Sequence, residues 1–503
     1  MRTAYSVETV RAAERELMAR LPEGALMRRA AAGLAAACAD VLGRVYGSRV
    51  VLLVGSGNNG GDALHAGARL ARRGAGVSAV LLAPEHAHPG GLAALRRAGG
   101  RVVGTDGAEE LIGRSDLVVD GIVGIGGTGG LRPDAVPLAE AAERARAAVV
   151  AVDLPSGVDA DTGEVRGRAL RADLTVTFGT HKPGLLIDPA REYAGAVRLV
   201  DIGLTLPDEP EVEALQHADV ARLLPVPAAE SDKYRRGVVG IAAGSARYPG
   251  AAVLAVAGAL RGGAGAVRYV GPAGQAVIAR FPETLVSDRG PKHAGRVQAW
   301  VVGPGAGDDA ATVAEVLAAD VPVLIDADGL RLAEASAVRG RRAPTLMTPH
   351  AGEAAALLGV ERVEVEGGRL DAVRELAGRY GAAVLLKGST TLVVGVGVGV
   401  GVGVGAGAGA GAGADARAGV GGGGGPVRVN PTGTSWLATA GSGDVLSGLG
   451  GSLLAAGLSA VDAGSAAAYL HGLAGRFAAD GAPVGARDVA EAVAGAWRSV
   501  VRG

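Results

Sequence analysis

The sequence predicts an α/β protein built from two domains in succession. Short apolar runs, each ending in glycine or a polar residue, alternate with helical stretches along most of the chain. The alternation weakens in the proline-rich stretch 201–227 and then restarts, which marks a domain boundary. The 503 residues, 49% of them hydrophobic, suffice for two or three domains with cores of their own. Each domain is therefore expected to contain a parallel sheet covered by helices on both faces.

Composition excludes several classes of protein. The 50 Lys and Arg residues balance 51 Asp and Glu residues, so the basic excess of a nucleic-acid-binding protein is missing. The single cysteine, Cys38, excludes a disulfide framework or a cysteine zinc site and indicates a reducing compartment. Charged residues crowd the N-terminus, and the longest uncharged run, 393–414, is too rich in glycine for a membrane helix. We expect a cytoplasmic protein that binds neither nucleic acid nor membrane.

The first half of the chain shows the alternation most clearly. Its first apolar run ends in a glycine-rich segment, from which a helix is expected to start near Gly61, and further strands follow at regular intervals. The expected strands are 49–55, 77–83, 116–121, 147–153, 173–178 and 196–201. Ligand sites in parallel sheets lie at the carboxyl ends of the strands, so the residues that follow these runs are the candidates for function.

The second half repeats the pattern after the boundary. A helix is expected at 249–261, and strands at 236–243, 299–303, 321–326 and 382–387. A glycine-rich stretch, 394–425, interrupts this half between a strand ending near Val394 and one near Val427. Ordering such a stretch costs much entropy and buries little surface, so we expect a tolerated surface insertion.

A glycine-rich loop follows the first expected strand. The segment Gly55-Ser-Gly-Asn-Asn-Gly-Gly-Asp62 opens a helix, where free N–H groups can receive a phosphate. Glycine-rich turns also occur for purely structural reasons, but two adjacent asparagines and an aspartate add oxygen ligands and a carboxylate. This combination favours a ligand site.

Polar residues follow three other strands of the first half. Asp120 precedes the glycine loop 121–130, Asp153 begins Asp-Leu-Pro-Ser-Gly157, and His181-Lys-Pro-Gly184 follows the strand at 173–178. A single aspartate in such a place can equally cap a helix or stabilise a turn. Because all of them lie at carboxyl ends of strands, we expect one shared pocket.

These motifs resemble the NAD(P)H-hydrate epimerase family, known as the YjeF N-terminal domain, from about Tyr5 to Leu204. The resemblance implies a Rossmann-like three-layer fold and a pocket for the hydrated nicotinamide nucleotide. Asp153 would be the acid/base residue, and Asn59, Asp120 and Ser156 would bind K⁺. The implied substrate contacts are Asn58, Asn59, Gly60, Gly61, Asp62, Gly124, Ile125, Gly126, Gly127, Thr128, Gly129, Gly130 and Asp153.

The second half carries motifs of another kind. Gly441-Ser-Gly-Asp444 opens a helix, where Asp444 can take a proton from a substrate hydroxyl while backbone amides stabilise a transferring phosphoryl group. Lys387-Gly-Ser-Thr-Thr391 lies at a strand end, where it could hold nucleotide phosphate. Gly303-Pro-Gly-Ala-Gly307 and Thr348-Pro-His-Ala-Gly-Glu353 each follow a strand. Each motif alone is a weak signal, but their joint order favours one catalytic site.

Taken together, these segments resemble the NAD(P)H-hydrate dehydratase family, with a ribokinase-like fold, from about Tyr234 to Arg498. The resemblance implies that ADP is the co-substrate and Mg²⁺ its metal, and that Asp444 is catalytic. The implied substrate contacts are Ala251, Gly305, His350 and Asp444, and the implied nucleotide contacts are Lys387, Gly388, Ser389, Thr390, Thr391 and Gly443.

The sequence thus predicts a bifunctional repair enzyme. An epimerase domain at 1–210 would interconvert the R and S forms of NAD(P)H hydrate, and a dehydratase domain at 231–503, after a linker at 211–230, would convert the S form to NAD(P)H, releasing AMP and phosphate. We expect a homo-oligomer. An alternative is a ribokinase-like small-molecule kinase fused to a non-catalytic nucleotide-binding module. Conversion of R to S hydrate, lost in Asp153→Asn, would separate an epimerase from such a module.

Overall fold

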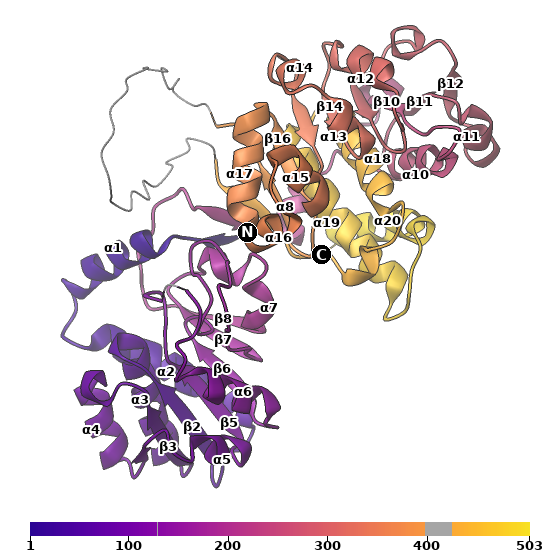
Figure 1. Ribbon diagram of the computed structural model, residues 1–503. Helices are drawn as coiled ribbons and strands as arrows, with labels where there is room; N and C mark the ends of the chain where they lie inside the picture. The colour runs from indigo at the N-terminus through magenta and orange to yellow at the C-terminus, as the bar shows by residue number, and fades with distance from the viewer. Residues whose placement is uncertain (128, 398–424, 503) are drawn as a thin grey trace, which may run out of the picture. The chain divides into compact units, whose positions relative to one another are not determined.

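The computed structural model describes residues 1–127, 129–397 and 425–502, and divides the chain into two compact units. Residues 2–214 and 366–370 form what we call the N-terminal unit. Met1, 215–365 and 371–503 form the C-terminal unit. The α/β prediction is confirmed in both units, each of which contains a largely parallel sheet (Figure 1).

The N-terminal unit is built on a parallel sheet with strand order β4-β3-β2-β5-β6-β7-β8. Its strands are β1 (Arg2–Ala4), β2 (Arg49–Val54), β3 (Gly76–Leu81), β4 (Arg101–Val103), β5 (Leu117–Gly121), β6 (Ala148–Val152), β7 (Leu174–Phe178), β8 (Ala196–Val200) and β9 (Val212–Ala214). Strand β1 pairs antiparallel with β9, apart from the parallel sheet.

Helices cover both faces of this sheet. They are α1 (Val7–Met18), α2 (Ala25–Leu42), α3 (Gly57–Arg72), α4 (Pro89–Arg97), α5 (Ala108–Gly113), α6 (Val136–Arg144) and α7 (Arg191–Ala194), with short 3₁₀ turns at Pro84–His86 and Pro183–Leu185. Helices α2, α3 and α4 share one buried cluster with the strands, and α5 and α6 share another. The single cysteine, Cys38, is fully buried in the first of these clusters. The unit therefore has three layers.

The C-terminal unit contains a larger sheet. From β12 to β16 the order is β12-β11-β10-β13-β14-β15-β16, all parallel, and β17 and β18 continue it antiparallel. Its strands are β10 (Val238–Ala242), β11 (Ala266–Val270), β12 (Leu285–Ser287), β13 (Ala299–Val302), β14 (Val323–Ile325), β15 (Thr345–Met347), β16 (Ala383–Leu386), β17 (Thr391–Val394) and β18 (Val427–Asn430).

The helices from α8 onward belong to this unit, except for residues 366–370, at the end of α16 and the start of α17. They are α8 (His217–Leu223), α9 (Lys233–Arg236), α10 (Pro249–Arg261), α11 (Gly274–Arg280), α12 (Ala310–Leu317), α13 (Asp328–Leu332), α14 (Ala335–Arg339), α15 (Ala351–Leu358), α16 (Arg362–Gly367), α17 (Arg369–Tyr380), α18 (Ser442–Ala455), α19 (Ala460–Ala479) and α20 (Ala486–Arg502). Further 3₁₀ turns lie at Pro291–His293 and Ser435–Leu437. No helix among the described residues is long and apolar enough to cross a membrane.

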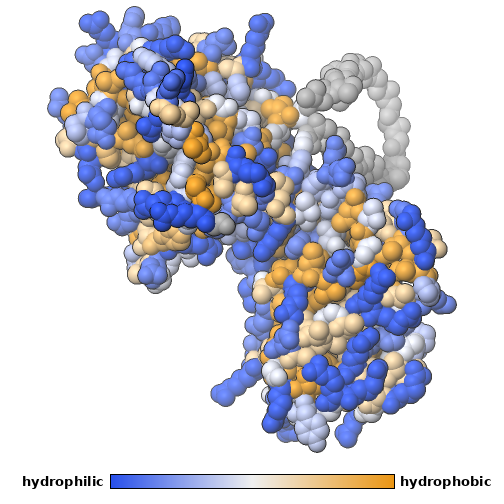
Figure 2. Space-filling model, turned by 180° about the vertical axis from the view of Figure 1, so that it is seen from behind, coloured by the Kyte–Doolittle hydropathy of each residue, from blue (hydrophilic) through white to orange (hydrophobic). Residues whose placement is uncertain are grey.

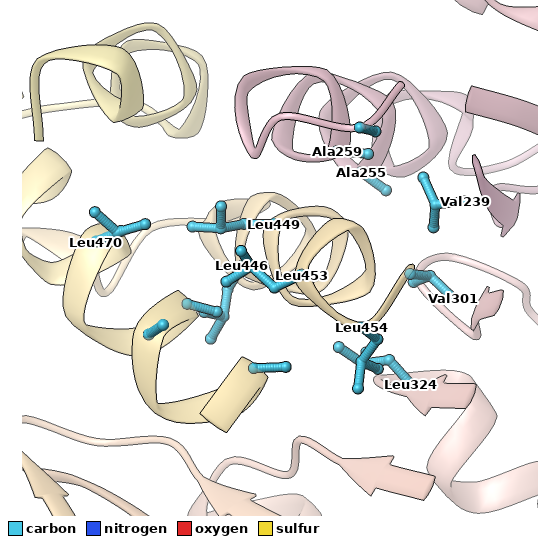
Figure 3. Packing of buried hydrophobic residues seen from close by; sticks show 14 of the residues in the cluster. Val239, Ala255, Ala259, Val301, Leu324, Leu446, Leu449, Leu453, Leu454 and Leu470 are labelled. Carbon is cyan, nitrogen blue, oxygen red and sulfur yellow. The ribbon is translucent and has the colours of Figure 1, made fainter. Parts of the chain in front are cut away.

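Helix α18 forms the centre of the C-terminal core. Leu446, Leu449 and Leu453 point from it into the cluster shared with α10, α19 and the strands (Figure 3). A methyl group on Gly448 would lie 1.9 Å from the backbone oxygen of Ala255, so glycine is required for this close approach of α18 to α10. This packing fixes the start of α18, where Asp444 lies.

The strands expected from apolar runs are present, with ends that differ by one or two residues. Two expectations differ more. Helix α3 begins at Gly57 instead of near Gly61, and the stretch expected as a linker contains β9 and α8. The predicted insertion at 394–425 falls almost entirely outside the described residues, but its flanking strands end at Val394 and begin at Val427 as expected. On the face shown in Figure 2, hydrophilic side chains are interspersed with hydrophobic ones over both units.

Candidate active sites

The candidate site of the N-terminal unit lies where the strand order reverses. Strand β2 is followed in the chain by β3 on one side of it, whereas β5 lies on its other side. Ligands of open parallel sheets bind in the crevice outside the carboxyl ends of strands at such a point. A cavity of about 1480 Å³ opens there, and its lining includes Asn58, Asn59, Asp62 and Asp153. The structure therefore brings the predicted carboxylate and amide residues together.

The predicted phosphate-binding loop is the first turns of α3. Ser56 precedes the helix, and Asn58 to Asp62 lie within it, with Gly60, Gly61 and Asp62 buried. The first N–H groups of a helix have no partner inside the helix, so this end can receive an anion. The segment following β5 lines the same cavity with Gly124, Ile125, Gly126, Gly127, Gly129 and Gly130. The predicted Thr128 lies outside the described residues.

Asp120 and Ser156 hydrogen-bond to each other, and Asn59 contacts Gly124 in the loop that follows β5. Asp120 is fully buried and accepts hydrogen bonds from the Ser156 hydroxyl (2.6 Å) and the Ser156 N–H (2.8 Å). Gly124 lies next to Asn59, since a methyl group on it would approach the Asn59 amide oxygen to 2.8 Å. With its amide turned, Asn59 donates to Val152 and accepts from the N–H of Gly124. Burial raises the pKa of Asp120 to about 6, against hydrogen bonds that lower it.

Asp153 adopts an unusual backbone conformation, and a buried lysine binds its side chain. Its φ of 67° lies in the left-handed region, which aspartate tolerates better than most residues. Its Oδ1 accepts from the Lys182 ammonium, from the hydroxyl of Thr177 (3.0 Å) and from the N–H of Phe178 (3.3 Å). Lys182 is 1% exposed and also donates to Thr177 and to the backbone oxygen of Phe178. One carboxylate oxygen of Asp153 is thus fixed.

Asp62 faces the same cavity without a hydrogen-bond partner on its buried Oδ1 among the described residues. Burial raises the pKa of Asp62 well above its usual range, and the neighbouring charges of Asp153 and Glu14 add to that rise. Glu14, from α1, also lines the cavity, and burial followed by Asp153 raises its pKa. Asp62, Glu14 and Asp153 therefore lie near one another with Lys182 beside them, and the charge of the neighbouring carboxylates opposes ionisation of Asp62 and of Glu14.

The strand order of the C-terminal unit reverses between β10 and β13, and the charged residues of the candidate site follow the nearby parallel strands β14 and β16. Asp326, directly after β14, binds the ammonium of Lys387 through Oδ1 (2.7 Å) and the hydroxyl of Ser447 through Oδ2 (2.5 Å). A methyl group on Gly443 would lie 3.5 Å from that ammonium. The predicted nucleotide residues Lys387 and Gly443 are therefore neighbours, and Asp326 joins them.

Asp444 lies in the first turn of α18, as predicted. Burial raises its pKa to about 7, and the negative charge of Asp326 contributes to that rise while Lys387 opposes it. Burial alone would lower the pKa of Lys387, but the carboxylates of Asp326 and Glu353 raise it above its usual value. A carboxyl group that ionises near neutrality can serve as a general base.

His350 begins α15 and caps it. Its Nδ1 accepts hydrogen bonds from the N–H groups of Gly352 (3.0 Å) and Glu353 (3.1 Å), while the Glu353 carboxylate accepts from the His350 N–H (2.8 Å). The Glu353 carboxylate also lies 3.6 Å from the Lys387 ammonium. Through Glu353, this capping box connects the predicted His350 to Lys387 and its partner Asp326.

The remaining predicted residues lie at the same sheet edge. Ala251 is in the first turn of α10, and a methyl group on Gly305 would come within 2.7 Å of its side chain. Residues 387–390 form the turn between β16 and β17, and Thr391 begins β17; Thr390 and Thr391 are buried, whereas Gly388 and Ser389 are exposed.

The sequence assigned no role to two side chains that the structure places centrally. Lys182 lies in the stretch 181–184, which was singled out as polar, but its buried pairing with Asp153 was not expected. Asp326 ends an expected strand as Asp120 and Asp153 do, and that shared position was the available signal.

Two family models match different parts of the chain. The family model described as YjeF-related protein N-terminus matches residues 23–184, and the NAD(P)H-hydrate dehydratase model matches 239–423 and 420–493. A bifunctional NAD(P)H-hydrate repair enzyme from Mycobacterium leprae is 48% identical over 95% of this chain and 94% of its own. One from Mycobacterium tuberculosis is 48% identical over 91% and 90%.

A solved structure is similar to part of the chain. It is an ADP/ATP-dependent NAD(P)H-hydrate dehydratase from Bacillus subtilis, co-crystallised with ATP and Mg²⁺. It is 26% identical, covers 57% of this chain and 97% of its own, and has a TM-score of 0.47. On the two family models and the full-length relatives, the chain belongs to the family of bifunctional NAD(P)H-hydrate repair enzymes.

Proposed function

We propose that this chain interconverts the R and S epimers of NAD(P)H hydrate in residues 1–210 and dehydrates the S epimer with ADP in residues 231–503. The observation that carries the proposal is the presence, in one chain of this family, of two separate carboxylate-centred sites at the carboxyl ends of parallel strands. Asp153 would supply the carboxyl group for epimerisation, and Asp444 the one for dehydration.

Asp153 is the acid/base group of the epimerisation. Lys182 and Thr177 hold one carboxylate oxygen, which orients the side chain in the cavity wall. The first turn of α3 and the loop 124–130 then receive the diphosphate of the nucleotide, because both offer backbone N–H groups. The substrate contacts are those that the sequence predicts.

The set Asn59, Asp120 and Ser156 fits K⁺. Asp120 is a buried carboxylate that is paired with no cationic side chain among the residues described, and burial raises its pKa to about 6. Amide, carboxylate and hydroxyl oxygens suit a hard cation, and a bound K⁺ would supply positive charge near the substrate phosphates. These three residues would hold the ion.

Dehydration needs a leaving group better than hydroxide. Asp444 takes the proton of the substrate hydroxyl, whose oxygen attacks the terminal phosphorus of ADP, and AMP leaves. The phosphate ester then loses phosphate with its bonding electrons, and loss of a proton from the neighbouring ring carbon restores the dihydropyridine. Lys387 lies beside this centre and binds the transferring phosphoryl group. Mg²⁺ bound with the nucleotide would neutralise phosphate charge there, and Glu353, 3.6 Å from the Lys387 ammonium, would offer it a carboxylate oxygen.

The test uses the purified full chain with an R/S mixture of NADH hydrate, K⁺, Mg²⁺ and ADP. Recovery of the reduced-nicotinamide absorbance from both epimers is the expected result, and the experiment is repeated with ATP. Recovery that stops at the S fraction would contradict the epimerase assignment. Absence of recovery with either nucleotide would contradict the dehydratase assignment and favour a kinase acting on another substrate.

A further inference from the structure

One face of helix α3 carries a carboxylate, Asp62, near its start and basic side chains toward its end. We call these basic side chains, with those that join them from other helices, the basic stretch of the cavity. Asp62, His65, Arg69 and Arg72 all line that cavity. Their spacing of three, four and three residues places them on one face of the helix. At a rise of about 1.5 Å per residue, Arg72 lies roughly 15 Å along the axis from Asp62. The cavity wall therefore changes from acidic to basic along one helix.

Side chains from two other helices extend this basic stretch. Arg28, from α2, and His88, which caps α4, also line the cavity. The rings of His65 and His88 lie 5.7 Å apart in an edge-to-face arrangement. The Nδ1 atom of His88 accepts a hydrogen bond from the N–H of Gly91 (3.0 Å), so the proton of the neutral ring is on Nε2.

The charge of this stretch is uncompensated among the described residues. Burial lowers the pKa of His65, and the positive charges of His88, Arg69, Arg72 and Arg28 lower it further, with no carboxylate opposing them. Arg28 donates to the backbone oxygen of Glu23, and neither Arg69 nor Arg72 forms an ion pair with a described carboxylate.

Several other arginines of the same unit are paired with carboxylates. Arg49 pairs with Asp116, Arg144 with Glu109, and Arg168 with Glu140. Like charges gathered on a cavity wall repel one another, and an anionic ligand relieves that repulsion. Arginine is the side chain best suited to bind phosphate in a bidentate manner. The basic stretch therefore has the chemistry of a phosphate site.

We propose that Arg28, Arg69 and Arg72 bind the 2′-phosphate on the adenosine end of NADPH hydrate. This inference rests on the proposed epimerase function. The start of α3 and the loop 124–130 lie beside Asp153 and suit the diphosphate, so the phosphate that remains is the one farthest from the nicotinamide ring. A cavity of about 1480 Å³ exceeds a pocket for a small ligand and has room for a whole dinucleotide. NADPH hydrate should accordingly bind more tightly than NADH hydrate.

The test measures conversion of the isolated R epimer to the S epimer by chromatography, without adenine nucleotide, so that dehydration does not contribute. The full chain is compared with Arg69→Gln/Arg72→Gln, using NADPH hydrate and NADH hydrate. We expect KM for NADPH hydrate to rise about tenfold in the double variant, because charged hydrogen bonds are lost. KM for NADH hydrate and kcat for both should stay unchanged.

Arg73→Gln is the matched control, because Arg73 is exposed at the end of the same helix and does not line the cavity. In the unaltered protein, added salt should raise KM for NADPH hydrate more steeply than KM for NADH hydrate, which needs no variant. An equal rise for both hydrates in the double variant would assign the arginines to the diphosphate and overturn the inference, as would no rise. If the unaltered chain epimerises neither hydrate, the proposed function itself fails.

Discussion

Burial and the adjacent carboxylate of Asp326 raise the pKa of Asp444 to about 7. A general base acts only when ionised, so kcat/KM for dehydration of the S epimer should rise with pH and level off above an inflection near 7. A pH–rate profile under saturating ADP measures this inflection. A profile that is flat from pH 5.5 to 8.5 would contradict the assignment of Asp444 as the base.

The position of that inflection should depend on Asp326. Asp326→Asn removes a negative charge beside Asp444 and releases Lys387, and both changes lower the pKa of Asp444. The inflection should therefore move to lower pH, with a lower kcat because Lys387 loses its anchor. Asp308→Asn is the control, since Asp308 is exposed and pairs with Arg331. An unshifted inflection in Asp326→Asn would show that burial alone sets this pKa.

The buried pair of Lys182 and Asp153 should contribute to stability as a unit. Lys182→Met leaves the Asp153 carboxylate buried without its cation, which should lower the free energy of unfolding by about 3 kcal/mol. Asp153→Asn/Lys182→Met should be destabilised by less than the sum of the single changes, because no charge is left unpaired. Urea unfolding of the four proteins measures the coupling. Strictly additive effects would mean that the two charges do not interact.

At the scale of the residue, the sequence predicts candidates where chemistry and position coincide. Asp120, Asp153 and Asp444 were predicted because each follows a strand or opens a helix; the structure places Asp120 at the end of β5, Asp153 after β6 and Asp444 in the first turn of α18, and their roles stay predictions. Lys182 could not be assigned, because its partner lies 29 residues away and is set by the pairing of β6 with β7. Contacts between distant segments have no local sequence signal.

At the scale of the element, helix α15 combines a cap with a predicted substrate contact in His350. His350→Ala removes the acceptor for two N–H groups and should cost about 1 kcal/mol of stability. His350→Asn keeps a capping side chain and should unfold close to the unaltered protein. Both variants should show a higher KM for the S hydrate, because both lose the exposed Nε2. Thermal melts measure the capping role and steady-state kinetics measure the substrate contact. An unchanged KM in His350→Asn would show that His350 only caps α15.

Elements were predicted well where one local signal dominates. Apolar runs identified the buried strands because parallel strands are covered on both faces. The start of α3 was misplaced because Asn58, Asn59, Gly60 and Gly61 are poor helix formers. Packing overrides that preference, since a methyl group on Gly60 would lie 2.5 Å from the backbone oxygen of Gly55. Helices α1 and α2 went unpredicted, and with them Glu14 and Arg28 of the cavity wall.

For the whole molecule, two separate sites imply that the two activities can be lost independently. Asp153→Asn with ADP should restore only the S fraction of a hydrate mixture, and Asp444→Asn should restore none. An equal mixture of the two full-length variants should restore both epimers, because the S epimer made by one can reach the other through solvent. Absorbance recovery measures all three. A mixture that stops at the S fraction would show that the intermediate does not leave the chain that forms it.

The burial of Cys38 has a practical consequence for studying such an enzyme. This thiol belongs to the single cysteine of the chain, it is fully buried on the core-facing side of α2, and burial raises its pKa to about 12. The thiolate that reacts with maleimides and disulfide reagents is thus absent at neutral pH. Thiol reagents should therefore leave the native protein unlabelled. Cysteines introduced at two exposed positions would be the reactive thiols, so a pair of fluorophores could report on substrate binding without removal of Cys38.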